Sequence, residues 1–247
     1  MIGKLAGKRC LVTGGSRGLG RAIALAFARE GGDVAFTYRA REDAARDTEE
    51  AIAAHGRRVL AFRGNVADAA HAREVAAQMK SDWGGIDVLV NNAGVTEVLP
   101  IAMIDEDEWD AVIDSHVKGA YLFSRAALKS MIRQKSGSIL SIGSFASDRV
   151  VESPVHYATA KAALRGFTES LAKEVGRHGI RVNLVAPGLL DHGLGKTLLP
   201  HRIDEYRGQA ALGRTGTVEE LAEACVFFAS DAASFVTGAK IVVDGGV

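Results

Sequence analysis

A tyrosine and a lysine stand four residues apart in this chain and could exchange a proton near neutral pH. Tyr157 and Lys161 fall in the segment YATAKAALRGFTESLAKEV, whose apolar spacing predicts a helix. Residues four apart share one side of a helix, so we expect Lys161 to lower the pKa of a phenol that otherwise titrates at about 10. An ordinary Tyr–Lys pair on a helix surface would show the same spacing.

A serine precedes this pair at the end of a predicted strand. Ser144 closes the run SILSIGS, thirteen residues before Tyr157. Sites in open parallel sheets form at the carboxyl ends of the strands, so Ser144 is expected beside Tyr157 and Lys161.

A glycine-rich turn, TGGSRGLG, links the first predicted strand to the helical segment RAIALAFARE. Such a turn lets the backbone approach a diphosphate, and the helix N-terminus supplies free N–H groups to the anion. The spacing is TGxxxGxG rather than GxGxxG, and a purely structural turn is the alternative. The residues expected at the anion are Gly14, Ser16, Arg17, Gly18, Leu19 and Gly20.

The end of the second predicted strand indicates which dinucleotide binds. An NAD site would place Asp or Glu there for the ribose 2′-OH, whereas this chain has Tyr38 followed by Arg39. Arg39 and Arg17 could pair with a 2′-phosphate instead. The sequence therefore favours NADP(H), with an ordinary solvated arginine as the alternative for Arg39.

The elements that must position these residues alternate along the chain. Short, nearly continuous apolar runs such as CLVTG, DVAFTY and IDVLVNN are separated by longer segments of helical period. This predicts a doubly wound α/β Rossmann fold, a parallel sheet of about seven strands with about six helices on its two faces. We expect one domain over residues 1–247, with a mobile substrate lid at residues 189–212, where glycines and Pro200 interrupt the alternation.

The glycine motif and the order Ser144, Tyr157, Lys161 resemble the short-chain dehydrogenase/reductase family. Matches at NNAG, at the Pro-Gly turn and at VTGAKIVVDGG extend the resemblance over essentially the whole chain. It implies that Tyr157 and Lys161 contact the cofactor as well as the substrate. The further cofactor contacts that it implies are Asn65 and Val66 at the adenine, Asn91, Ala93 and Gly94 at the ribose, and Pro187 and Gly188 at the nicotinamide.

The resemblance also implies a reaction. A nicotinamide hydride goes to a carbonyl carbon while Tyr157 protonates the oxygen, Ser144 holds that oxygen, and Lys161 helps to return a proton to Tyr157. The family usually has asparagine, anchoring a relay water, where this chain has His116. His116 also shares a predicted face with Trp109, so it is a core histidine or a relay residue. His192 stands where the family often has a threonine for the nicotinamide, and Asn65 where it more often has Asp.

The closest overall similarity within the family is to 3-oxoacyl-(acyl-carrier-protein) reductases, so a 3-oxoacyl thioester on acyl carrier protein or CoA is the leading substrate. An acidic carrier protein would dock beside the site near Lys135 and His178, which are otherwise ordinary surface charges. The alternatives are a reductase or dehydrogenase of a small ketone, sugar or polyketide intermediate, and a non-catalytic cofactor-binding protein. A homotetramer is expected from the resemblance.

Composition narrows the partners. Lys plus Arg and Asp plus Glu number 30 each, so no net charge attracts nucleic acid or an anionic membrane. Cys10 and Cys225 lie in apolar segments without metal-ligand spacing, and we expect buried reduced thiols and no metal site. No apolar run is long enough for a signal sequence or a membrane span, so the cytoplasm is the expected compartment.

Overall fold

One seven-stranded sheet forms the centre of the protein in a computed structural model, which describes residues 3–193 and 198–247. The sheet order is β3-β2-β1-β4-β5-β6-β7, and each neighbouring pair is parallel. The strands are β1 Arg9–Val12, β2 Asp33–Tyr38, β3 Val59–Arg63, β4 Val88–Asn91, β5 Gly137–Ile142, β6 Ile180–Pro187 and β7 Lys240–Val243.

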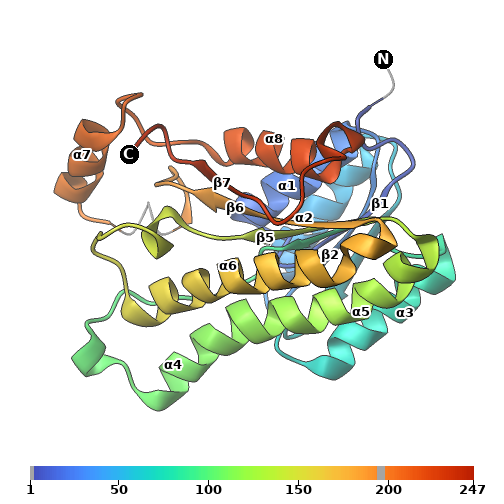
Figure 1. The fold of residues 1–247 in the computed structure, drawn as a ribbon, viewed down its shortest axis with the longest axis horizontal. Coiled ribbons are helices and arrows are strands. Elements are labelled where there is room, and N and C mark those ends of the chain that lie inside the picture. The colour runs from blue at the N-terminus through green and yellow to red at the C-terminus, as the bar shows by residue number, and fades with distance from the viewer. Residues whose placement is uncertain (1–2, 194–197) are drawn as a thin grey trace.

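Helices cover both faces of this sheet, as Figure 1 shows, with α1 and α8 on one side and α5 and α6 on the other. One apolar core joins α1, α2 and α8 to the sheet, and a second joins α3, α5 and α6 to its other face. The helices are α1 Gly18–Arg29, α2 Glu42–Ala53, α3 Ala69–Trp83, α4 Glu106–Ile113, α5 Gly119–Gln134, α6 Val155–Val175, α7 Pro200–Gln209 and α8 Val218–Ala229. Burial on both faces explains the nearly continuous apolar strands.

The predicted single-domain Rossmann architecture is confirmed. The strand order reverses between β1 and β4, and the cleft beyond the carboxyl ends of the strands at such a point is where this fold binds ligands. The thiols of Cys10 and Cys225 are free and fully buried, as expected, and burial raises the pKa of Cys225 to about 12. No helix in the described ranges is long and apolar enough to cross a bilayer.

Two segments differ from the sequence-based expectation. The helical segment in which Trp109 and His116 were expected to share a face is α4 and α5 joined by a π-helical turn, Asp114–Lys118, which contains His116. The predicted lid at residues 189–212 holds a helix, α7, whose first residue is Pro200, a good helix-starting residue because its N–H needs no partner there. Residues 194–197 of that lid lie outside the described ranges.

Candidate active site

Ser144, Tyr157 and Lys161 meet at the carboxyl end of β5. Ser144 stands two residues beyond the end of β5, and Tyr157 lies in the first turn of α6. The Lys161 ammonium donates a hydrogen bond to the Ile142 carbonyl at 2.7 Å and lies 5.5 Å from the centre of the Tyr157 ring. The structure therefore brings together the three residues that the sequence predicted as neighbours.

Burial sets the protonation of this cluster. It lowers the pKa of the Lys161 ammonium to about 7 and raises the pKa of the Tyr157 phenol, an effect that a hydrogen bond with Ser144 partly offsets. The expectation that Lys161 lowers the pKa of Tyr157 is therefore wrong for the protein without ligand, because desolvation of the phenol dominates. Tyr157 is protonated at neutral pH, as a proton donor must be.

His116 contacts this cluster from the π-helical turn. Its ring meets the Tyr157 ring edge-on, with centroids 5.6 Å apart and planes at 82°. The turn also fixes the loop after β4, because Val95 N–H donates to the Ser115 hydroxyl at 3.3 Å and the Val95 carbonyl lies 3.0 Å from His116 Nε2. π-helical turns are rare and recur at functional sites.

The hydrogen bonds of His116 define its tautomer. A carbonyl only accepts, so Nε2 carries the proton that bonds Val95, while burial and the nearby Lys161 charge lower the imidazole pKa and keep the ring neutral. Nδ1 is then a buried acceptor with no partner among the described residues. The ring also fills the space beside Gly94, where any Cβ would overlap it. His116 is thus a buried histidine that also presents a free acceptor next to Tyr157.

The glycine-rich turn is tied to the neighbouring elements by its own backbone. Gly14 N–H donates to the Thr37 hydroxyl at 3.2 Å, and Gly15 N–H donates to the Thr37 carbonyl at 2.9 Å. The Thr48 hydroxyl on α2 donates to the Ser16 carbonyl at 3.1 Å. These contacts hold the turn against the carboxyl end of β2, where Tyr38 and Arg39 lie.

The N-terminus of α1 is open to an anion. Arg17 at the N-cap makes no side-chain cap hydrogen bond, and the first turn holds no acidic residue. Gly20 permits this geometry because a Cβ there would overlap the Gly14 carbonyl. Free N–H groups and the positive helix end favour a phosphate here. Arg17 and Arg39 are both exposed, so either can reach an anion in solvent.

The segment after β4 reveals residues that sequence reasoning missed. The Thr13 hydroxyl accepts from the N–H groups of Asn92 and Ala93, both at 3.0 Å, and the Asn92 amide donates to the Thr13 carbonyl at 2.9 Å. Thr13 and Asn92 therefore join the glycine turn to β4. Asn91, which was predicted at the cofactor, donates its amide N–H to the Ser124 hydroxyl at 3.0 Å, and its Oδ1 has no hydrogen-bond partner among the described residues. Thr13 opens the motif TGGSRGLG, which is the signal that could have found it.

The other predicted cofactor residues lie along the same edge of the sheet. Asn65 follows β3, and its side chain accepts from Ala67 N–H at 3.1 Å. Val66 packs beside Gly119. Pro187 ends β6, and Gly188 follows it so tightly under Asp244 that a Cβ would lie 2.6 Å from the Asp244 Cα atom.

Tyr206 of α7 is a further residue that the sequence did not single out. Its hydroxyl donates to the Asp244 carbonyl at 2.6 Å, and its ring meets the Phe145 ring edge-on at 5.6 Å. Phe145 directly follows Ser144. Tyr206 therefore connects α7, which falls in the predicted lid, to the loop that carries a predicted catalytic residue.

Lys135 and His178 lie far from this site within one chain. They adjoin the starts of β5 and β6, where Gly179 packs directly on the Lys135 carbonyl. The rise of about 1.5 Å per residue along α6 puts Val175 roughly 27 Å from Tyr157. Within one chain the two residues stand at the edge of the sheet opposite Tyr157, because they follow the C-terminal ends of α5 and α6, and carrier docking at them stays a prediction.

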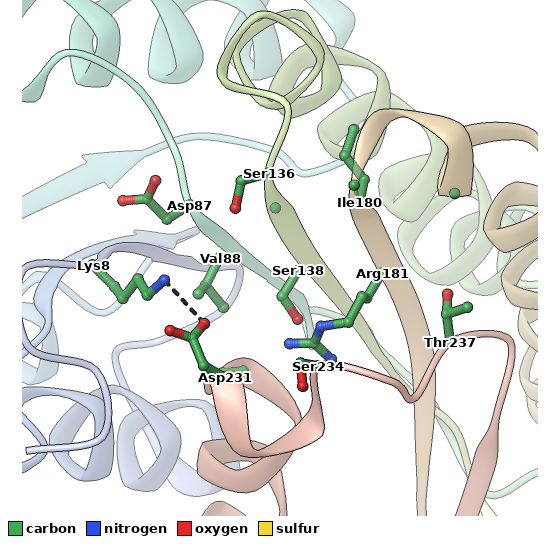
Figure 2. A pocket seen from close by; sticks show the side chains of 14 residues that line it. Lys8, Asp87, Val88, Ser136, Ser138, Ile180, Arg181, Asp231, Ser234 and Thr237 are labelled. Atoms are coloured by element: carbon green, nitrogen blue, oxygen red, sulfur yellow. Dashed lines mark hydrogen bonds and ion pairs between the residues drawn. The ribbon is translucent and has the colours of Figure 1, made fainter.

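A cavity of about 290 Å³ also lies at the amino ends of the strands, away from Ser144 and Tyr157 (Figure 2). Two charged side chains on its wall already have polar partners, since Lys8 pairs with Asp231 at 3.2 Å and Arg181 donates to the Phe228 carbonyl at 2.7 Å. Nothing in this cavity resembles the catalytic cluster.

Comparison with known proteins agrees with the geometry. A family model described as Enoyl-(Acyl carrier protein) reductase matches residues 14–247. The 3-oxoacyl-[acyl-carrier-protein] reductase FabG of Salmonella typhimurium is 36% identical over 241 residues, covering 98% of this chain and 97% of that protein. The corresponding Staphylococcus aureus protein is 38% identical over 240 residues, covering 97% and 98%. The chain belongs to the short-chain dehydrogenase/reductase family.

Solved structures of this dehydrogenase/reductase family share the fold closely. A short chain dehydrogenase from Burkholderia cenocepacia in complex with NADP has a TM-score of 0.92 at 35% identity and covers 98% of each chain. A short-chain type dehydrogenase/reductase from Mycobacterium marinum has a TM-score of 0.89 at 35% identity, covering 98% of this chain and 95% of that one. The sequence-based family assignment is confirmed.

Proposed function

We propose that this protein is an NADPH-dependent carbonyl reductase whose substrate is a 3-oxoacyl thioester. The observation that carries the proposal is the meeting of Ser144, Tyr157 and Lys161 beside an open helix N-terminus, in a chain 36–38% identical to relatives named 3-oxoacyl-[acyl-carrier-protein] reductase. Burial raises the pKa of Tyr157, so the phenol is protonated at neutral pH and can donate a proton to a substrate oxygen.

The residues of this chain have distinct tasks in the reaction. The nicotinamide, when bound, supplies the hydride. The Tyr157 phenol donates its proton to the substrate oxygen, and the Ser144 hydroxyl hydrogen-bonds the same oxygen and orients it. Lys161, fixed by the Ile142 carbonyl, would hold the nicotinamide ribose of a bound cofactor and would help to return a proton to Tyr157. His116 Nδ1 accepts from a water in that relay.

The cofactor assignment rests on residues around the glycine turn. No carboxylate stands at Tyr38 or Arg39 to accept from a ribose 2′-OH, and two exposed arginines flank the open end of α1. NADP(H) therefore fits better than NAD(H), and we assign the 2′-phosphate to Arg17 and Arg39. The other cofactor contacts that we propose are Gly14, Ser16, Gly18, Leu19, Gly20, Asn65, Val66, Asn91, Ala93, Gly94, Pro187 and Gly188.

Exposed apolar side chains favour an acyl substrate over a sugar. They lie in three places: the segment after β4, the segment between Ser144 and Tyr157, and the residue directly before α7. A sugar would be met by polar side chains, whereas an acyl chain covers apolar surface. The exposed residues are Val98, Ile101, Met103, Val150, Val155 and Leu199.

We propose that an acyl carrier protein delivers the substrate. We also propose that the enzyme is a homotetramer and that it works in the cytoplasm. Docking at Lys135 and His178 requires a second copy that brings its own α6 end to this active site. Exposed Phe227, Phe235 and Ile241 offer apolar surface for such assembly. Light scattering of the purified protein tests the tetramer, and Lys135→Glu should raise KM for the carrier-bound substrate only.

The decisive test is a comparison of Tyr157→Phe with the wild type. Tyr157→Phe removes the proton donor and little else, so kcat should fall by about a hundredfold or more while the Kd for NADPH stays within about twofold. Lys161→Ala should impair both. Near-normal turnover by Tyr157→Phe would exclude Tyr157 as the acid.

A panel of substrates is assayed with NADPH and with NADH, and turnover is measured by the loss of nicotinamide absorbance. We expect the highest kcat/KM with NADPH and 3-oxoacyl thioesters, and a loss of NADPH preference in Arg39→Ala. The matching family model is described as an enoyl reductase, so a 2-enoyl thioester belongs in the panel with small ketones and sugars. Preference for any of these three would replace the 3-oxoacyl assignment.

A further inference from the structure

The imidazole of His192 lies directly on the glycine turn. A Cβ built on Gly18 would stand 2.7 Å from His192 Nε2 and 2.8 Å from Cδ2, so the ring packs against the glycine backbone. Gly18 has a φ of 55°, in the left-handed region that glycine tolerates best. The absence of a side chain at Gly18 therefore leaves room for the His192 ring at the start of α1.

The backbone around His192 is held in place from one side by the core. Asp191 N–H donates to the Gly216 carbonyl, and Gly216 N–H donates to the Leu189 carbonyl, both at 3.0 Å. These bonds form an isolated parallel bridge between Leu190 and Gly216, and Leu190 packs against the core that contains α1 and α8. The position of the ring is thus set by anchored residues immediately before it.

The chemistry of this position matches a diphosphate. The first N–H groups of α1 have no partners within the helix, and Arg17 leaves them uncapped. These N–H groups would contact a bound diphosphate from the side of α1 only. An imidazole ring nitrogen next to Gly18 can add a hydrogen-bond donor from the side of the lid segment.

We propose that His192 donates a hydrogen bond to the diphosphate of the bound cofactor, which is then held between α1 and the segment after β6. This inference rests on the proposed function, since that function supplies the nucleotide. His192 is on this view a positioning residue for the cofactor. It differs from Arg17 and Arg39 in serving NADPH and NADH equally, because both carry the diphosphate.

The test measures ligand affinity by calorimetry, without turnover, in wild type and His192→Phe. The ligands are NADPH, NADH, 2′-phospho-ADP-ribose, which lacks nicotinamide, and adenosine 2′-monophosphate, which lacks the diphosphate. His192→Phe keeps a ring and removes the donor, so affinity for the first three should fall about tenfold and that for the last should not change. His192→Gln restores a side-chain N–H and should recover most of the loss.

The control is His201→Phe, an exposed histidine of α7, which should leave all four affinities unchanged. Unchanged affinities in His192→Phe would overturn the inference. So would a loss confined to NADPH and NADH, because the ring would then contact the nicotinamide. Failure of the wild type to bind any nucleotide would instead overturn the proposed function itself. Equal thermal midpoints show that the variants remain folded.

Discussion

At the scale of single residues, Lys161 couples catalysis to stability. The residue is 4% exposed, and burial lowers the pKa of its ammonium group from 10.5 to about 7. Below about pH 7 both the native and the unfolded chain hold this proton, so the cost of burying the charge is present in full. Between about 7 and 10.5 the unfolded chain holds a proton that the native chain has released. Stability therefore rises with pH across that window.

Replacing Lys161 by methionine should remove this dependence. From pH 7 to pH 9 the wild-type free energy of unfolding should gain about 2 kcal/mol relative to Lys161→Met, which is measurable by urea denaturation at the two pH values. Lys129→Met, which removes an exposed lysine of α5, should keep the wild-type dependence. Parallel behaviour of wild type and Lys161→Met would show that Lys161 titrates normally.

Two variants of His116 distinguish a role in the proton relay from a role in packing. His116→Asn can still anchor a water and should keep kcat near wild type, whereas His116→Leu should lower kcat by about tenfold or more. His116→Leu also leaves the Val95 carbonyl without its donor, at a cost of about 1 kcal/mol. Turnover and unfolding midpoints of both variants decide the matter. Unchanged kcat in His116→Leu would remove His116 from the catalytic residues.

At the scale of elements, α7 is fastened to the active site at two points. Tyr206 bonds the Asp244 carbonyl and packs on Phe145, and Arg202 pairs with Glu152 in the loop before α6. These contacts join the lid helix to the segment that carries Ser144. They do not touch the glycine turn.

Loss of the Tyr206 contacts should therefore affect the substrate more than the cofactor. In Tyr206→Ala we expect KM for the acyl substrate to rise about tenfold and the Kd for NADPH to stay within about twofold, because α7 loses its packing on Phe145. Tyr121→Ala, at a tyrosine that is 47% exposed on α5, serves as the control. An equal weakening of NADPH binding would show that α7 supports the cofactor as well. Steady-state kinetics and calorimetry supply the two values.

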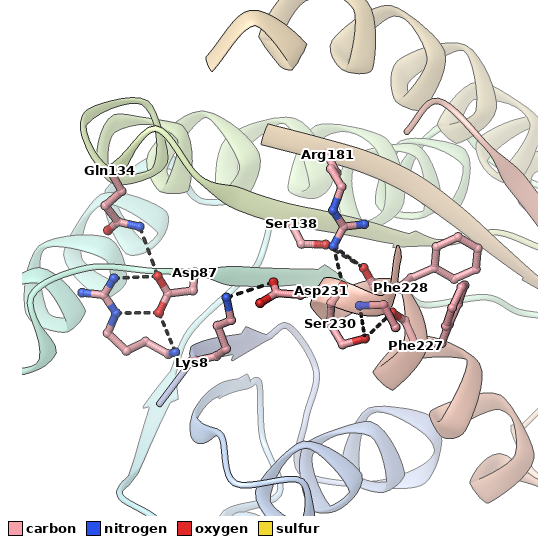
Figure 3. A network of polar contacts seen from close by, with 11 residues as sticks. Lys8, Asp87, Gln134, Ser138, Arg181, Phe227, Phe228, Ser230 and Asp231 are labelled. Carbon is pink, nitrogen blue, oxygen red and sulfur yellow. Dashed lines mark hydrogen bonds and ion pairs between the residues drawn. The ribbon is translucent and has the colours of Figure 1, made fainter. Parts of the chain in front are cut away.

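At the scale of the whole molecule, the two edges of the sheet have different tasks. The amino edge carries a polar network in which the Arg9 guanidinium bonds both Asp87 oxygens, at 2.7 and 2.6 Å, and Gln134 reaches Asp87 at 3.2 Å (Figure 3). It links β1, α5 and the residue before β4. The catalytic cluster lies at the carboxyl edge. The network therefore serves stability rather than chemistry.

Disrupting this network should lower the stability of the protein without lowering kcat. Asp87→Asn removes a partly buried partner of Arg9, and we expect the free energy of unfolding to fall by about 1–3 kcal/mol with unchanged kcat. Asp43→Asn breaks the exposed pair with Arg41 and should leave the unfolding midpoint unchanged. A fall in kcat for Asp87→Asn at a temperature where it is folded would contradict this division.

The alternation of apolar strands and helical segments was enough to predict the parallel sheet, because strands covered on both faces need continuous apolar runs. Local spacing was likewise enough to predict that Tyr157 and Lys161 lie together, because residues four apart share one face of a helix. The glycine-rich turn was also predictable from local sequence. Gly14, Gly18 and Gly20 themselves indicate a tight turn that larger residues would not allow.

The tertiary structure decided what depends on contacts between distant segments. The π-helical turn at His116 is stabilised by hydrogen bonds with Val95 in the loop after β4, and no local sequence pattern predicts this turn. The anchoring of α7 by Tyr206 and the contact of His192 with Gly18 likewise join residues far apart in the chain. The sequence by itself determined the family and the fold, because the family's motifs and the apolar periodicity are short-range features, and it predicted Ser144, Tyr157 and Lys161 as the catalytic residues. Protonation, tautomers and the far position of Lys135 followed only from burial and packing, which depend on how the whole chain folds.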